Sequence, residues 1–478
     1  MLLKFKSRAY LVIIILVVYF NFLLYQQGMA AYANVCDNFR KGEITDSVPC
    51  KENKEFNYAL YLPVNYSDTV KWPVIYVFDA AAKGAHALSY YKQGAEKYGY
   101  ILIGSNNSRN GMVWDKYYEI ADYLFDDTND RFSIDTNRIY TSGISGGSRV
   151  ASLVAMDKHV AGVIGCAAGF PLHHPRSAKI PDFVYLGLIG KRDGNYLEMF
   201  DLEQKLKANG NRVVIRAYDY GHDWPSPSIL VDAIEWINLQ AMNKGTIEKN
   251  SSFIDGQFAK EIYQARTYLQ LGEYLESYKW YCSITEDFAC HPGILKIQIT
   301  KDSLERSKGY KKDLRKWDKA RIEELEFMKK MIGALNNIVF AEHINDSVRS
   351  LCNNRVRILK KQEKSKNAYK NIRASRLLSF LILNLYVEGE NYTSAALYSK
   401  AIFIYELWKI AQPDNKYLLY TLARVYAYDK NYKASLKSLE EAAELGLDIK
   451  SMVENDDAFS GLKSDKRYNE LLKILTKD

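Results

Sequence analysis

The stretch from residue 56 to about residue 240 alternates short apolar runs with helix-like segments. The runs are rich in β-branched and aromatic residues and read FNYALYL, PVIYVFD, YILIGS, RIYTSG, VAGVIGCAA, DFVYLGLIG and VVIRAYD. Between them, segments such as 85–98, 114–125 and 199–208 have the length and apolar spacing of crossover helices. Because strands that alternate with helices pair in parallel, we expect an α/β fold with a mostly parallel sheet and helices on both faces.

The organisation of the chain changes near residue 250. With 478 residues, the chain is too long for one ordinary hydrophobic core. Beyond residue 250 the strand pattern stops, glycine and proline become sparse, and long helical patterns continue to the C-terminus. We therefore expect an α/β domain over 34–248 and an all-α domain over 249–478.

The second domain carries three similar segments, ARTYLQLGEYLESYKWYCSI, LNLYVEGENYTSAALYSKAI and ARVYAYDKNYKASLKSLEEA. They align on Tyr274, Tyr392 and Tyr432. A tyrosine six residues earlier lies on a first helix, and a small residue three residues later opens a second; these residues are Tyr268, Tyr386, Tyr426, Ser277, Ala395 and Ser435. The pattern resembles tetratricopeptide repeats, although the last two anchors are 40 residues apart and not about 34. The resemblance implies a concave surface for a protein partner or for self-association.

Residues 1–33 have the layout of an export signal. Basic residues precede an apolar run over 9–24, and Ala31-Tyr32-Ala33 forms an A-x-A cleavage site. We expect a signal peptide that is cleaved there, with the mature chain secreted or periplasmic. The same run is long enough to remain uncut as a single N-terminal membrane anchor, with the body still outside the cytoplasm. This alternative stays open.

Six cysteines in an exported chain indicate disulfides, and the pairs close in sequence are Cys36 with Cys50 and Cys282 with Cys290. Their connectivity stays open. Cys166 lies in the apolar run VAGVIGCAAG, which favours a buried small side chain over a reactive thiol.

The sequence Gly143-Ile144-Ser145-Gly146-Gly147 directly follows the run RIYTSG and precedes the helix-compatible run SRVASLVAM. This is a G-x-S-x-G motif between a strand and a helix. The chemistry needs glycines there because the nucleophile lies on a strained turn, where neighbouring side chains would collide. The helix N-terminus favours negative charge beside the reacting atom. Ser145 is therefore the candidate nucleophile.

A serine hydroxyl needs a base to take its proton and a carboxylate to orient that base. Where the nucleophile lies in a G-x-S-x-G turn between a strand and a helix, the order along the chain is serine, acid, histidine, and the acid and the histidine lie on loops after later strands. Asp193 follows the run DFVYLGLIG, and His222 follows VVIRAYD. We expect them to be the acid and the base. Other carboxylates considered for the acid are Asp182, Asp201 and Asp219.

The developing oxyanion needs backbone N–H donors, usually one after the nucleophile and one in the loop after an earlier strand. Gly146 supplies the first. The run VIYVFDAAAKG places Ala80 or Ala81 as the second donor. This run resembles the strand and His-Gly loop of typical esterases, with Asp79 at the position of the histidine, so the choice between Ala80 and Ala81 stays open.

Together these residues resemble the α/β-hydrolase superfamily, in particular the exported esterase branch with polyhydroxybutyrate depolymerases and feruloyl esterases. The resemblance covers about residues 55–240 and depends on SNNSRNG, IYTSGISGGSRVA, GKRD and GHDWP. Candidate substrate-binding residues, weighed against ordinary loop roles, are Asn107, Arg109, His173, His174 and Trp224. His173 and His174 lack a third ligand at zinc-like spacing, so we expect no metal.

The sequence therefore predicts an exported serine hydrolase that cleaves carboxylic esters through a Ser-His-Asp triad and an acyl-enzyme, without a cofactor. A peptidase or amidase with the same triad, and a non-catalytic interaction protein acting through the helical repeats, are the alternatives. The net charge of +8 is spread along the chain without a basic run, so we expect no nucleic-acid partner. Because all proposed catalytic groups precede residue 248, we expect the first domain to act without the second.

Overall fold

A computed structural model describes residues 39–171, 180–340, 346–448, 452–453 and 456–474. The described chain forms two compact units. The first contains the chain up to Leu188, together with Leu202–Ile215 and Trp224–Gln257. The second contains Ile189–Asp201, Arg216–Asp223 and the chain from Phe258 onward. Two short segments that the sequence assigned to the α/β domain therefore belong to the same compact unit as the C-terminal helices.

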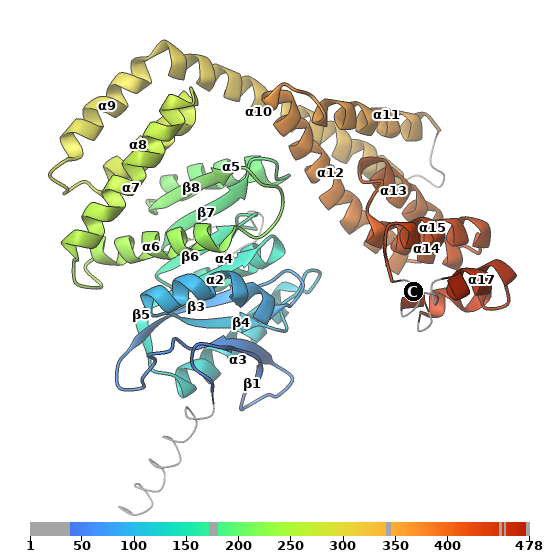
Figure 1. Cartoon of the computed structure of the whole chain (residues 1–478), viewed down its shortest axis with the longest axis horizontal. Helices are drawn as coiled ribbons and strands as arrows, with labels where there is room; N and C mark the ends of the chain where they lie inside the picture. The colour runs from blue at the N-terminus through green and yellow to red at the C-terminus, as the bar shows by residue number, and fades with distance from the viewer. Residues whose placement is uncertain (1–38, 172–179, 341–345, 449–451, 454–455, 475–478) are drawn as a thin grey trace, which may run out of the picture. The chain divides into compact units, whose positions relative to one another are not determined.

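The α/β part is built on an eight-stranded sheet with the order β1-β2-β4-β3-β5-β6-β7-β8 (Figure 1). The strands are β1 (Ile44–Pro49), β2 (Asn57–Tyr61), β3 (Trp72–Phe78), β4 (Ile101–Ser105), β5 (Ile134–Ile144), β6 (Gly162–Cys166), β7 (Val184–Gly190) and β8 (Val213–Tyr218). Pairing is parallel from β4 through β3, β5 and β6 to β7, and β2 is antiparallel to both β1 and β4. The predicted mostly parallel sheet is confirmed.

Every one of the seven predicted runs contains a strand, because the central strands are buried on both faces. All residues of β3, β4, β6 and β7 are buried, which requires continuous apolar runs. Strand β1 was not predicted from the sequence. Three of its six residues, ITDSVP, are polar and one of the six is buried, and it pairs with β2 at the edge of the sheet, across a register shift.

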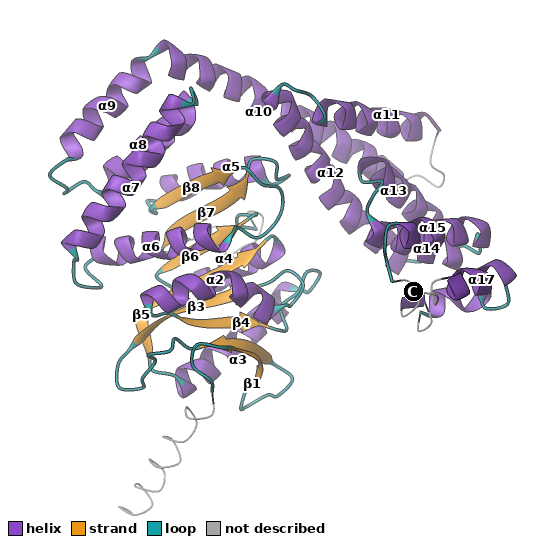
Figure 2. Ribbon diagram, in the orientation of Figure 1, coloured by secondary structure: helices purple, strands orange, loops and turns teal. Residues whose placement is uncertain are grey.

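Helices connect the strands of the sheet as the sequence predicts (Figure 2). They are α2 (Gly84–Tyr98), α3 (Trp114–Arg131), α4 (Gly146–Lys158), α5 (Tyr196–Ala208) and α6 (Pro227–Asn243). Helix α2 packs against α6, and α3 packs against α4. Helices α2 and α3 each combine a buried, mainly apolar stripe with exposed polar positions, as expected for crossover helices.

The C-terminal part is all-α in its described residues, as predicted. Its elements are α7 (Ser251–Gln270), α8 (Tyr274–Asp287), α9 (Ile294–Arg306), α10 (Lys308–Phe340), α11 (Asp346–Glu363), α12 (Ala368–Ser394), α13 (Tyr398–Ala411), α14 (Lys416–Tyr428), α15 (Tyr432–Glu444), the 3-10 helix η3 (Asp457–Leu462) and α17 (Lys466–Ile474). Helix α12 packs against α13, and α14 packs against α15. The last pair covers a core with Leu419, Leu439 and Phe459.

The alignment of the second repeat-like segment was wrong by six residues. Tyr392 lies inside α12, and Ala395 is the residue that ends that helix, so neither opens a second helix. The second helix begins at Tyr398. Tyr398 precedes Tyr432 by 34 positions, which is the spacing that the tetratricopeptide pattern requires.

The corrected register brings equivalent small residues to equivalent places. Ser277 and Ser435 are buried, and each hydroxyl donates to a carbonyl oxygen of the preceding helix at 2.8 Å, to Ala265 and to Ala423. Ala401 is the buried counterpart in the middle segment. Small side chains at these positions let the two helices of a pair approach closely.

Within the described residues, Cys282 and Cys290 are not joined by a disulfide. Cys166 is fully buried, and burial raises the pKa of its thiol to about 12. This agrees with an unreactive packing role. Cys36 and the export segment 1–33 lie outside the described residues. Within the described residues, no helix combines the length and the apolarity that crossing a membrane requires.

Candidate active site

Ser145 occupies the turn between β5 and α4, where the strand runs directly into the helix. Its backbone has φ 55° and ψ −122°, a conformation that costs energy for any residue with a Cβ atom. The turn is held by the Ser145 N–H, which donates to the carbonyl oxygen of Cys166 at 2.9 Å. The side chain is half-buried. Such a turn is the geometry expected for a nucleophile at the carboxyl end of a parallel strand.

Two glycines of the motif are required by close backbone approach. A Cβ atom at Gly143 would lie 2.4 Å from backbone atoms of Gly147, and one at Gly147 would lie 2.0 Å from the carbonyl oxygen of Phe78 in β3. These separations are far below van der Waals contact. The helix α4 can therefore start against β3 only because both positions lack a side chain.

Gly147→Ala is expected to lower the free energy of unfolding by about 2 kcal/mol, because the methyl group overlaps a strand backbone that cannot move aside. Thermal or urea unfolding of the full chain measures this. The matched control is Gly256→Ala on α7, where a Cβ atom meets nothing within 4 Å. Equal stabilities of the two variants would contradict the close packing of this turn.

The loop after β3 presents the candidate oxyanion donors. The Ala81 N–H donates to Oδ1 of Asp79 at 2.8 Å, and the Ala80 carbonyl accepts from the N–H of Asn110 at 2.9 Å. The peptide unit between Ala80 and Ala81 is therefore engaged on both sides. Of the two alternatives that the sequence left open, the geometry favours the N–H of Ala80.

Asp79 is a buried carboxylate with a structural role at this loop. Its Oδ2 accepts from the indole N–H of Trp224 at 3.3 Å, and Trp224 stacks on Tyr90 with 5.5 Å between ring centroids. Trp224 is only 8% exposed. The structure thus gives Trp224, a sequence candidate for substrate binding, a packing and hydrogen-bonding role beside Asp79.

Asp193 and His222 contact each other. Nδ1 of His222 lies 3.0 Å from each carboxylate oxygen of Asp193, so the carboxylate holds the proton on Nδ1 and leaves Nε2 as the basic nitrogen. Asp193 is completely buried and also accepts from the N–H of Asn195 at 2.8 Å. Ser145 belongs to the first compact unit, and the Asp193–His222 pair belongs to the second.

The other carboxylates considered for the acid pair elsewhere. Asp182 binds Lys244 at 3.2 Å, Asp201 binds Arg321 at 2.6 Å, and Asp219 binds Arg192. Asp182 and Asp219 are also largely exposed. Asp193, in contrast, contacts His222, with 3.0 Å between Nδ1 of the imidazole and each carboxylate oxygen.

The remaining sequence candidates have other surroundings. The Asn107 side chain accepts from the N–H of Asn57 and donates to the carbonyl of Glu55, both at 2.8 Å, so it fixes its own loop. Arg109 is exposed, and its backbone pairs with that of Ala81. His173 and His174 lie outside the described residues.

Asn110 was missed by the sequence reasoning. Besides its N–H bond to Ala80, its side-chain oxygen lies against Gly146, where a Cβ atom would come within 1.8 Å of it. The loop SNNSRNG contributes to the family resemblance and contains the candidate substrate-binding residues Asn107 and Arg109, but Asn110 was not among the candidates. Asn110 thus borders both candidate oxyanion donors.

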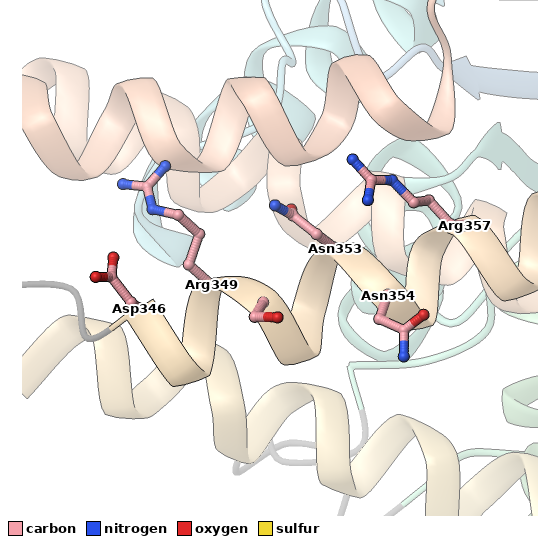
Figure 3. Close-up of a pocket in the computed structure, with 6 residues that line it drawn as sticks. Asp346, Arg349, Asn353, Asn354 and Arg357 are labelled. Atoms are coloured by element: carbon pink, nitrogen blue, oxygen red, sulfur yellow. The ribbon is translucent and has the colours of Figure 1, made fainter.

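Among the described residues of the second compact unit, side chains line at least two pockets, and neither of these is lined by Ser145. One, of about 480 Å³, follows α11, and Figure 3 shows Arg349, Asn353 and Arg357 extending from that helix. Arg349 already pairs with Glu406 at 3.1 Å. The other, of about 260 Å³, is lined by side chains that include Lys191 and Arg376.

No protein-family model and no curated protein sequence matches the chain. Among solved structures, the S-formylglutathione hydrolase of Staphylococcus aureus is 15% identical, with a TM-score of 0.33 over 38% of this chain and 92% of its own. An esterase of Pyrobaculum calidifontis is 14% identical, with a TM-score of 0.34 over 46% and 93%. The fluorophosphonate-binding serine hydrolase F of Staphylococcus aureus is 15% identical, with a TM-score of 0.33 over 41% and 99%.

Proposed function

We propose that this chain is a serine hydrolase that cleaves carboxylic esters. The observation that carries the proposal is the strained turn of Ser145, with φ 55°, between β5 and α4. An α/β protein gains no stability from such a conformation, and a serine presented this way serves nucleophilic attack. The hydrogen-bonded Asp193–His222 pair, on loops after β7 and β8, supplies the other two groups of a triad.

In the proposed reaction, Oγ of Ser145 attacks the acyl carbonyl while Nε2 of His222 takes the hydroxyl proton. The Asp193 carboxylate stabilises the resulting imidazolium through Nδ1–H. The N–H groups of Gly146 and Ala80 donate to the carbonyl oxygen as it becomes negative. His222 then gives the proton to the leaving alcohol, and a water molecule activated by the same histidine hydrolyses the acyl-enzyme.

The substrate class follows from the resemblance and from the chain's spacing. Asp193 follows Ser145 by only 48 positions, which leaves little room for a large cap domain, so we propose an open site that admits bulky or polymeric esters. The similar structures are described as esterases and serine hydrolases. We also propose export of the chain through residues 1–33, and a protein partner or a second copy on the helical repeats.

The proposal is tested with p-nitrophenyl esters of increasing acyl length and with aminoacyl p-nitroanilides, each with the full chain and with Ser145→Ala. We expect ester turnover that depends on Ser145 and exceeds amide turnover. Faster amide cleavage would assign the triad to a peptidase or amidase. Absence of Ser145-dependent turnover on both series would contradict the proposal.

A further inference from the structure

Residues Lys191–Tyr196, here called the acid loop, carry Asp193 and connect β7 to α5. They form turns and contain no regular secondary structure before α5 begins. The loop belongs to the second compact unit, together with α10 and α12. Its orientation therefore depends on contacts to helices far along the chain.

The tightest contact joins Gly194 to α12. The Gly194 N–H donates to Oγ of Ser379 at 3.0 Å, one residue after the proposed catalytic acid. A Cβ atom at Gly194 would lie 2.4 Å from the backbone nitrogen of Phe380. The loop backbone thus rests directly on the helix, at a position where only glycine fits.

Arg376 holds the loop one turn earlier on α12. Its guanidinium binds both carboxylate oxygens of Glu324 on α10, and its Nη1 donates to the carbonyl oxygen of Lys191 at 3.3 Å. The same guanidinium lies 4.4 Å from the ring centroid of Tyr196. Glu324 is fully buried and Arg376 is 9% exposed. A buried bidentate pair fixes the arginine, which contacts both ends of the acid loop.

Two side chains of the loop itself reach further helical residues. Nζ of Lys191 donates to Glu273 at 3.1 Å, at the start of α8, and Arg192 donates to Asn371 of α12 at 3.4 Å. Inside the loop, the Asp193 carboxylate accepts from Asn195, and its backbone carbonyl accepts from Tyr196 at 3.1 Å. A displacement of Gly194 or Tyr196 is therefore transmitted to Asp193.

We propose that α12, fixed by the Arg376–Glu324 pair, holds the acid loop so that Asp193 faces His222, and that Arg376 and Ser379 are positioning residues for the triad. This inference rests on the proposed hydrolase function. The helical region is then part of the catalytic apparatus. A misplacement of about 1 Å in such a group costs about 10²-fold in rate, so the contacts matter even without touching substrate.

The test compares kcat and KM of Ser379→Ala, Arg376→Gln and Gly194→Ala in the full chain. We expect kcat to fall about tenfold for Ser379→Ala and about 10²-fold for the other two, with KM changed less than about threefold. Ser379→Thr, which keeps the hydroxyl, restores kcat. Matched controls are Ser303→Ala and Arg306→Gln on α9, both exposed, and Gly256→Ala. None of these should change kcat.

A double-mutant cycle separates positioning from a general loss of structure. If Ser379 acts through Asp193, Ser379→Ala lowers kcat in the native background and has no further effect in Asp193→Asn. Additive effects, or unchanged kcat in all three variants while Ser145→Ala remains inactive, would overturn the inference and leave the proposed function intact. Full activity of Ser145→Ala would instead overturn the proposed function, and the inference with it.

Discussion

Ser145→Ala is expected to lower kcat on a small soluble ester by about 10⁶-fold, because no other group on the turn replaces the nucleophile. The fold should be unaffected. Ser145 is half-buried, and the positive φ of this position costs alanine about as much as serine. The loss of activity is measured as kcat, and the stability of the fold is measured by thermal unfolding of the same preparation.

The matched control is Ser228→Ala, an exposed serine in the first turn of α6. It should keep full activity. Residual activity of Ser145→Ala within about tenfold of the unmodified chain would assign the reaction to another residue.

His222→Ala should cost nearly as much as loss of the serine, because members of a triad act as a unit. Asp193→Asn should cost about 10⁴-fold, since an amide at that position no longer holds the proton on Nδ1 or stabilises the imidazolium. The 3.0 Å contacts between Nδ1 of His222 and both oxygens of Asp193 are the basis of this expectation. The measurement is kcat/KM on the same ester.

Asp182→Asn is the control for that substitution, because Asp182 is exposed and pairs with Lys244. It should leave kcat/KM unchanged. Full activity of Asp193→Asn would show that another carboxylate, such as Asp219, orients the base.

The strands were predictable because their signal is local. Parallel strands buried on both faces must be continuous apolar runs, and β3, β4, β6 and β7 are of this kind. The nucleophile turn was equally local, since Gly143 and Gly147 are required by approaches within the motif and to the neighbouring strand. Edge strand β1 has few buried residues and therefore no such signal.

The register of the middle repeat was not predictable from the local pattern. Tyr392 and Tyr398 are six residues apart, and each is followed three residues later by alanine. Either tyrosine satisfies the pattern. What decides between them is the length of α12, which continues to Ser394 because its apolar face stays buried along the helix.

Contacts between distant segments account for the rest. Gly194 and Ser379 are 185 positions apart, and Asp79 and Trp224 are 145 positions apart, so no sequence window contains either pair. The sequence led us to expect that residues 34–248 act alone. The acid-loop proposal gives the opposite expectation for that fragment, because it lacks Arg376, Ser379 and Glu324.

The most direct test of the central claim is to label the full chain with a fluorophosphonate probe and to map the modified peptide by mass spectrometry. A nucleophilic serine activated by a histidine reacts with such a probe, whereas ordinary surface serines do not. We expect one phosphonylated residue, Ser145, and loss of labelling in His222→Ala. Modification of a different serine, or labelling that persists in Ser145→Ala, would contradict the account.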